Sequence, residues 1–139
     1  MATRVLSRQE MKIDCEDDVL LVRRRVQMLA QQRGFDPFAT AALTTATSEL
    51  TRNVWIHAGR GQAVVEEIAE GGRCGIRVQF RDEGPGIADI ERALRGGYST
   101  AGSLGLGLSG SRRLVDHLNI ESAPGRGTVV TILKWARLR

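Results

Sequence analysis

Apolar residues recur three or four positions apart in two segments of the N-terminal half of the chain. The first segment predicts a helix over residues 16–32, with Asp14 as its N-cap. The second predicts a helix over residues 37–58, because Asp36 followed by Pro37 is a typical N-cap and first helical residue. Both helices therefore have an apolar side that can pack against a sheet.

Strict alternation of apolar and polar residues predicts β-strands in the remainder of the chain. Within residues 74–82 the apolar side chains of Ile76, Val78 and Phe80 share one face, and polar side chains occupy the other. The pair of glycines at 71 and 72 predicts a tight hairpin to the preceding strand. The expected strands cover residues 5–14, 62–70, 74–82, 119–123 and 127–135.

Glycine-rich segments separate the last elements. We expect a short helix around residues 88–95, a Gly/Ser-rich loop over 96–107 and a helix over 107–118. The elements predict an α/β (α+β) two-layer sandwich, with helices on one face of a mixed, mostly antiparallel sheet. The length of 139 residues suits a single domain, residues 1–139.

Composition and charge narrow the possible partners. The net charge is +4, but the basic residues are scattered and aromatic residues make up only 4%, so we expect no nucleic-acid partner. No segment has the roughly 20 apolar residues of a membrane span and no signal peptide is evident, so we expect a cytoplasmic protein with no membrane contact. Cys15 and Cys74 stand apart, which argues against structural zinc or a disulfide framework.

The second helix carries the first candidate for chemistry. Glu49 and Asn53 are four residues apart and therefore share one helix face. A solvated surface explains such a pair, and His57 one turn further on is typical of a packing histidine. A carboxylate next to an amide oxygen can also form a hard-cation site with an acid/base group beside it.

Two glycine-containing segments are further candidates. Asp82 ends a strand and is followed by Gly84 and Gly86, which suits either a simple turn or a place where a flat ring approaches the backbone. Residues 96–108 combine glycines with the start of a helix, whose free N–H groups can hold an anion. The context excludes a Rossmann fingerprint, and both a Walker P-loop and the protein-kinase motifs are missing.

Together these segments resemble the N, G1 and G2 boxes of the GHKL (Bergerat-fold) ATP-binding superfamily. The likeness is greatest to the anti-sigma-factor and switch-protein serine kinases, and among these to the stressosome switch kinases of the RsbT type. It rests on the segments SELTRNVWIHAGRGQ, DEGPGIADIERAL, GYSTAG and LGLGLSGSRRLVD. The resemblance implies ATP and Mg²⁺ as cofactors.

For the adenine ring, the resemblance implies a hydrogen bond from the amino group to Asp82, with Thr128 assisting through water. Gly84 and Gly86 would let the ring lie against the backbone. Asn53 would coordinate Mg²⁺. The full set of cofactor-binding residues implied is Asn53, Asp82, Gly84, Gly86, Ile87, Ser99, Thr100, Gly102, Leu104, Gly105, Leu106, Gly107, Leu108 and Thr128.

For the reaction, the resemblance implies that Glu49 is the catalytic base, that Arg52 contacts phosphate or substrate, and that residues 96–108 form a lid. The implied activity is a serine/threonine kinase that phosphorylates a STAS-domain antagonist or scaffold protein in a partner-switching pathway. A PP2C-type phosphatase or a sigma factor is a further possible partner, and the oligomeric state stays open. The alternative is an ATP-gated anti-sigma or phosphatase-activating module with little kinase activity.

Overall fold

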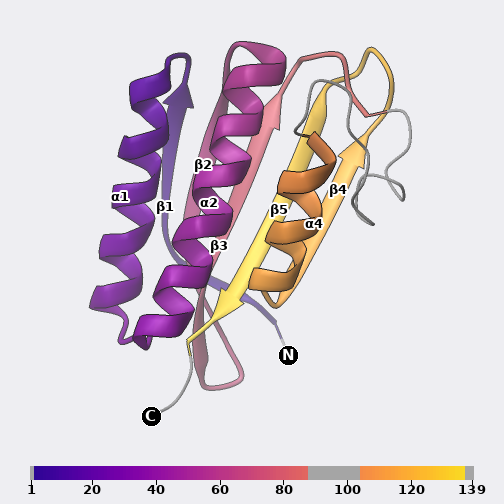
Figure 1. Ribbon diagram of the computed structural model, residues 1–139. Coiled ribbons are helices and arrows are strands. Elements are labelled where there is room, and N and C mark those ends of the chain that lie inside the picture. The colour runs from indigo at the N-terminus through magenta and orange to yellow at the C-terminus, as the bar shows by residue number, and fades with distance from the viewer. Residues whose placement is uncertain (1, 88–103, 137–139) are drawn as a thin grey trace.

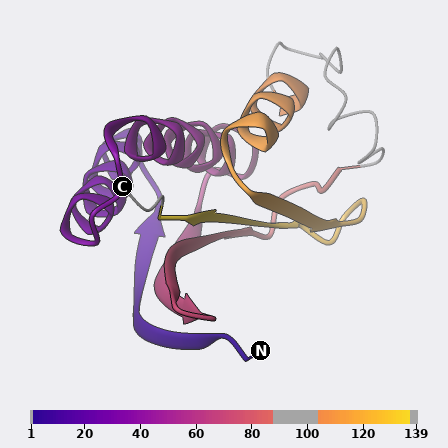
Figure 2. The same cartoon turned by 90° about the horizontal axis from the view of Figure 1, so that it is seen from below.

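The computed structural model describes residues 2–87 and 104–136, with only the backbone described for 104–107. Its sheet has the strand order β1-β2-β3-β5-β4, and all neighbouring strands are antiparallel. The helices lie on one face of this curved sheet (Figures 1 and 2), so the predicted two-layer α/β sandwich is confirmed. The elements are β1 (Arg4–Ile13), α1 (Glu16–Gln32), α2 (Pro37–Ala58), β2 (Gly61–Glu70), β3 (Arg73–Asp82), α4 (Leu104–Leu114), β4 (His117–Ser122) and β5 (Thr128–Trp135).

Helix α2 has the predicted ends, and the predicted signals produce them. The carboxylate of Asp36 accepts a hydrogen bond of 2.7 Å from the N–H of Ala39, and Pro37 is the first helical residue. At the other end Gly59 adopts a left-handed conformation with φ 81°, which stops the helix. Local sequence therefore determines where this helix begins and ends.

The start of α1 differs from the prediction. Cys15, not Asp14, is the N-cap residue, and its side chain makes no capping hydrogen bond. Instead the carboxylate of Asp18, in the first turn, accepts a hydrogen bond of 2.9 Å from the backbone N–H of Asp14. The acid in the first turn therefore reaches back to the residue before the N-cap, one position earlier than the N–H that a capping box engages.

The helix predicted over residues 107–118 is shifted toward the N-terminus and runs from Leu104 to Leu114. Glycines here were expected to form a loop, but they lie within the helix. It ends early because the N–H of Asp116 bonds to the carbonyl of Leu133, which starts the pairing of β4 with β5. The short helix predicted at 88–95 lies outside the described residues.

The core lies between α2 and the sheet. Ile76, Val78 and Phe80 of β3 are at most 1% exposed and face the helices, whereas Arg77 on the other face pairs with Glu66 at 2.9 Å. The alternation predicted for this strand is therefore confirmed. Helix α2 contacts both α1 and α4 (Figure 1), which makes it the central element of the helical layer. No helix in the described part of the chain is long and apolar enough to cross a membrane.

Candidate functional site

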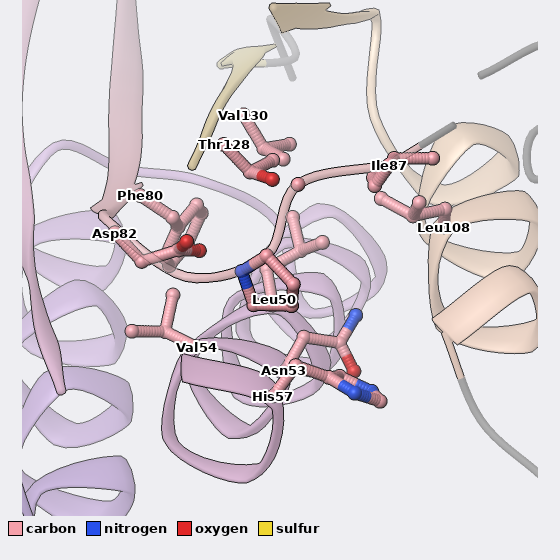
Figure 3. Close-up of a pocket in the computed structure, with 12 residues that line it drawn as sticks. Leu50, Asn53, Val54, His57, Phe80, Asp82, Ile87, Leu108, Thr128 and Val130 are labelled. Atoms are coloured by element: carbon pink, nitrogen blue, oxygen red, sulfur yellow. The ribbon is translucent and has the colours of Figure 1, made fainter. Parts of the chain in front are cut away.

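A cavity lies between the C-terminal half of α2 and one end of the sheet (Figure 3). The antiparallel register pairs Asp82, the last residue of β3, with Thr128, the first residue of β5. Both strand ends face the helix α2 across the cavity. The described residues that line it are Leu50, Asn53, Val54, His57, Phe80, Asp82, Pro85, Gly86, Ile87, Leu108, Thr128 and Val130.

Asp82 is the acid at the sheet side of the cavity. One carboxylate oxygen accepts a hydrogen bond of 2.9 Å from the N–H of Gly84, and the backbone of Thr128 also bonds to the carboxylate. Burial raises the pKa of the Asp82 carboxyl above its ordinary value, although these two N–H groups and the nearby His57 act to lower it. The result is a half-buried hydrogen-bond acceptor between apolar walls.

Asn53, a residue of α2, lies across the cavity from Asp82 (Figure 3). Its Nδ2 atom is buried and has no hydrogen-bond partner among the described residues. A buried amide without a partner costs free energy, about 1–3 kcal/mol, and native structures rarely keep one without a reason. An unpaired Nδ2 of this kind is expected where a bound ligand supplies the missing acceptor.

Glu49 and Arg52 are not among the described residues that line the cavity. Both are exposed on α2, and Glu49 is one turn before Asn53 on the same side of the helix. A group that meets a second, incoming molecule must be reachable from solvent. The positions of these two side chains suit contact with such a molecule better than contact with a buried ring.

Close backbone contacts explain the glycines of the segment after β3. Gly86 has φ 79°, and a Cβ atom there would lie 2.0 Å from the carbonyl oxygen of Ala123. At Gly84 a Cβ atom would lie 2.8 Å from the Cβ of Ala58, at the end of α2. These glycines let the segment fit between the end of α2 and the β4–β5 turn.

Ser122, which the sequence did not single out, holds together segments that border the cavity. Its hydroxyl accepts from the N–H of Ile87 at 2.9 Å, donates to the carbonyl of Gly127 at 2.7 Å and lies 2.9 Å from the Thr128 hydroxyl. It therefore joins three segments that form the cavity. The signal was present in the sequence, since a hairpin centred on the turn before Gly127 places Ser122 opposite Thr128.

Helix α4 closes the cavity on a third side. Leu108 is 1% exposed and lines the cavity together with Ile87. Leu104, Gly105, Leu106 and Gly107 form the first turn of this helix instead of the loop that was predicted. Ser99, Thr100 and Gly102 lie outside the described residues.

Comparison with known proteins places the chain among nucleotide-binding domains. The family model described as "Histidine kinase-like ATPase domain" matches residues 12–134. The serine/threonine-protein kinase RsbT of Bacillus subtilis is 40% identical over 126 residues, which cover 91% of this chain and 95% of that protein. The anti-sigma F factor of Thermoanaerobacter sp. is 33% identical over 101 residues, or 68% of this chain and 69% of that protein.

A solved structure supports the fold alone. The RsbU and RsbW domains of Rv1364c from Mycobacterium tuberculosis align with a TM-score of 0.65 at 18% identity. The alignment covers 95% of this chain but only 33% of that one, so the present chain spans about a third of that protein. The arrangement of helices on one face of the sheet is thus shared with a known fold.

Proposed function

We propose that the chain, which belongs to the histidine kinase-like ATPase family, transfers the γ-phosphoryl group of ATP to a STAS-domain protein in a partner-switching pathway. Within that family it is a serine/threonine-protein kinase. The proposed kinase domain comprises residues 1–139 and acts in the cytoplasm. One observation supports the proposal most directly. A half-buried carboxylate and a buried amide without a partner face each other across an apolar cavity.

The cavity chemistry fits an adenine ring. Asp82 would accept a hydrogen bond from the exocyclic amino group, and Thr128 would assist from the next strand. Leu50 and Val54 on one side and Ile87 on the other offer apolar surface to the ring faces. Such a mixture of apolar walls and a few placed polar groups is typical of cofactor sites.

The amide of Asn53 fits a magnesium ion bound to the phosphates. Its carbonyl oxygen is a hard ligand of the kind that Mg²⁺ takes, and its Nδ2 lacks an acceptor that a phosphate oxygen could supply. Mg²⁺ is held by few protein ligands and keeps its other positions for water and phosphate oxygens, so a single amide is sufficient. The ion would neutralise charge on the phosphates.

We propose Glu49 as the base that acts on the acceptor hydroxyl. As the hydroxyl oxygen bonds to the γ-phosphorus, the bond from that phosphorus to the β,γ-bridging oxygen breaks. ADP leaves with the electron pair, and the hydroxyl proton passes to the carboxylate of Glu49. An exposed carboxylate one turn from Asn53 can reach a hydroxyl delivered from outside. Arg52, exposed beside it, would contact a phosphate or the acceptor protein.

The experiment that tests the proposal follows phosphate transfer. The protein is incubated with labelled ATP, Mg²⁺ and the STAS-domain protein encoded nearest to it, and the Glu49→Ala variant is treated in parallel. Loss of the base should lower the transfer rate by about 10²–10⁴-fold while ATP still binds. The control variant is Glu16→Ala, which removes an exposed carboxylate from the start of α1.

Two results would reject the proposal. One is the absence of label on the acceptor, and the other is equal transfer by the Glu49→Ala variant. Nucleotide-dependent capture of a sigma factor without any phosphorylation would instead favour the binding module. A PP2C-type phosphatase is proposed as a downstream partner, and the same capture experiment with that phosphatase tests it.

A further inference from the structure

Helix α2 presents a ridge toward solvent in which five of six residues are exposed and Ala42 is half-buried. Its members follow one another at spacings of four and three residues, which places them on one side of the helix. The carboxylate of Glu49 and the side chain of Arg52 lie within it, and a large exposed apolar residue stands at each end. The α2 ridge consists of Phe38, Ala42, Thr45, Glu49, Arg52 and Ile56.

The N-terminal end of the ridge borders a groove of about 410 Å³ between α2 and α4. Phe38 is 82% exposed, more than any other large apolar side chain among the described residues. Ala42 from α2 and Leu114 from α4 continue the apolar lining, and the polar Thr45 of α2 also lines the groove. An exposed aromatic side chain beside a groove is the type of residue that dominates protein–protein binding energy.

Basic side chains border the same groove. Arg113 of α4 and Lys134 of β5 line it, and the Nζ of Lys134 lies 4.0 Å from a carboxylate oxygen of Asp116. Arg113 is exposed and has no acidic partner within the described parts of the chain. An occupant with an apolar side chain next to carboxylates would complement both features.

The ridge has the right dimensions for a folded acceptor protein. Phe38 and Glu49 are separated by about three helical turns, or about 16 Å along the axis of α2. A domain of about 100 residues has a radius of gyration of about 13 Å, so one domain can contact both positions. An acceptor held at Phe38 would thus reach the carboxylate that takes its proton.

We propose that the α2 ridge, together with Arg113 of α4 across the groove from Phe38, is the docking surface for the protein that receives the phosphoryl group. This inference rests on the proposed kinase function and adds the surface on which the acceptor binds. The acceptor contributes an apolar side chain to the groove and carboxylates to Arg113. Its hydroxyl lies further along the ridge, at Glu49.

Steady-state kinetics with the STAS-domain acceptor test the docking surface. Phe38→Ala and Arg113→Ala should each raise the KM for the acceptor by about tenfold. The kcat and the ATP affinity should stay within about twofold, because neither side chain lines the nucleotide cavity. The matched controls are Leu20→Ala, which removes a side chain 55% exposed on α1, and Arg112→Ala, which removes the neighbouring exposed arginine of α4.

The outcomes separate the docking surface from the kinase function. If the unaltered protein transfers phosphate and the KM for the acceptor is unchanged in both Phe38→Ala and Arg113→Ala, the docking surface is overturned. The proposed kinase function then still stands. No transfer by the unaltered protein overturns both. A homodimer that dissociates in the Phe38→Ala variant, measured by analytical ultracentrifugation, assigns the ridge to a second copy of the chain and also overturns the proposal.

Discussion

Asp82 and Thr128 pair directly where β3 and β5 meet at the end of the sheet, and the backbone of Thr128 bonds to the carboxylate of Asp82. The residues come from distant parts of the chain, yet the strand register holds them side by side. The proposed contact with adenine therefore depends on the pairing of these two strands as much as on the acid itself.

Replacing Asp82 by asparagine should weaken nucleotide binding and reduce the preference for ATP over GTP. The amide has nearly the shape of the carboxylate, but one acceptor oxygen becomes a donor that would face the amino group of adenine. We expect a loss of about 1–3 kcal/mol in the binding free energy of ATP. Isothermal titration with ATP and GTP measures both affinities, and an unaltered ratio between them would contradict the assigned role.

Asn53→Ala should have opposite effects on nucleotide binding and on folding. Without the amide, Mg²⁺ should no longer strengthen ATP binding, so affinities with and without the metal should converge. The variant should also unfold at a higher temperature, because alanine favours the helix by about 0.5 kcal/mol or more and a buried Nδ2 without a partner is removed. Titrations with magnesium or with a chelator, together with thermal unfolding, measure both effects.

Asn119→Ala is the control for this variant, since it removes an exposed asparagine from β4, away from the cavity. A metal dependence that persists in Asn53→Ala would show that the metal is held elsewhere.

The contact between Gly86 and the β4–β5 turn can be measured with a matched pair of variants. Gly86 and Gly125 have nearly equal positive φ angles, 79° and 76°, but a Cβ atom would clash with Ala123 only at Gly86. In Gly125→Ala the free energy of unfolding should fall by about 1–2 kcal/mol, from backbone strain alone. Gly86→Ala should lose about 1–3 kcal/mol more from overpacking. Urea unfolding gives both values, and equal losses would mean that the contact with Ala123 is not needed.

The carboxyl of Asp18 should make the stability of the fold depend on acidity. Its side chain is 4% exposed, and the pKa is lowered to about 2, first by the N–H of Asp14 and further by Cys15 and Lys12, against the effect of burial. Because the pKa is lowered in the folded state, the carboxylate stabilises the fold at pH values above its ordinary pKa of 3.8. This contribution to the free energy of unfolding is lost as the pH falls toward 2. At neutral pH it amounts to about 2 kcal/mol.

Urea unfolding between neutral pH and pH 2 should therefore show a steeper acid-induced loss of stability in the unaltered protein than in Asp18→Asn. The neighbouring variant Asp17→Asn, at an exposed position, should follow the unaltered protein. Parallel curves for the unaltered protein and Asp18→Asn would rule out this contribution.

Elements whose ends are encoded locally follow from the amino-acid sequence alone. Asp36, Pro37 and Gly59 define α2, and alternation along β3 identifies the face that packs in the core. Motif order was sufficient to indicate a nucleotide site and to name Asn53 and Asp82, which the structure brings to one cavity. The ends of α2 and the buried face of β3 depend on neighbours within a few residues, so short-range patterns reveal them.

Other features arise from contacts between segments that are distant in the sequence, and these become visible in the folded chain. Ser122 reaches Ile87 and Thr128 because β4 folds back on β5, and the hairpin pattern, which places Ser122 opposite Thr128, does not reveal its contact with Ile87. Helix α4 begins at Leu104 despite its glycines, because a helix packed against α2 gains burial that outweighs poor intrinsic propensity. Helix propensity is a local quantity, about 1 kcal/mol for each glycine relative to alanine, whereas burial and register are properties of the whole fold.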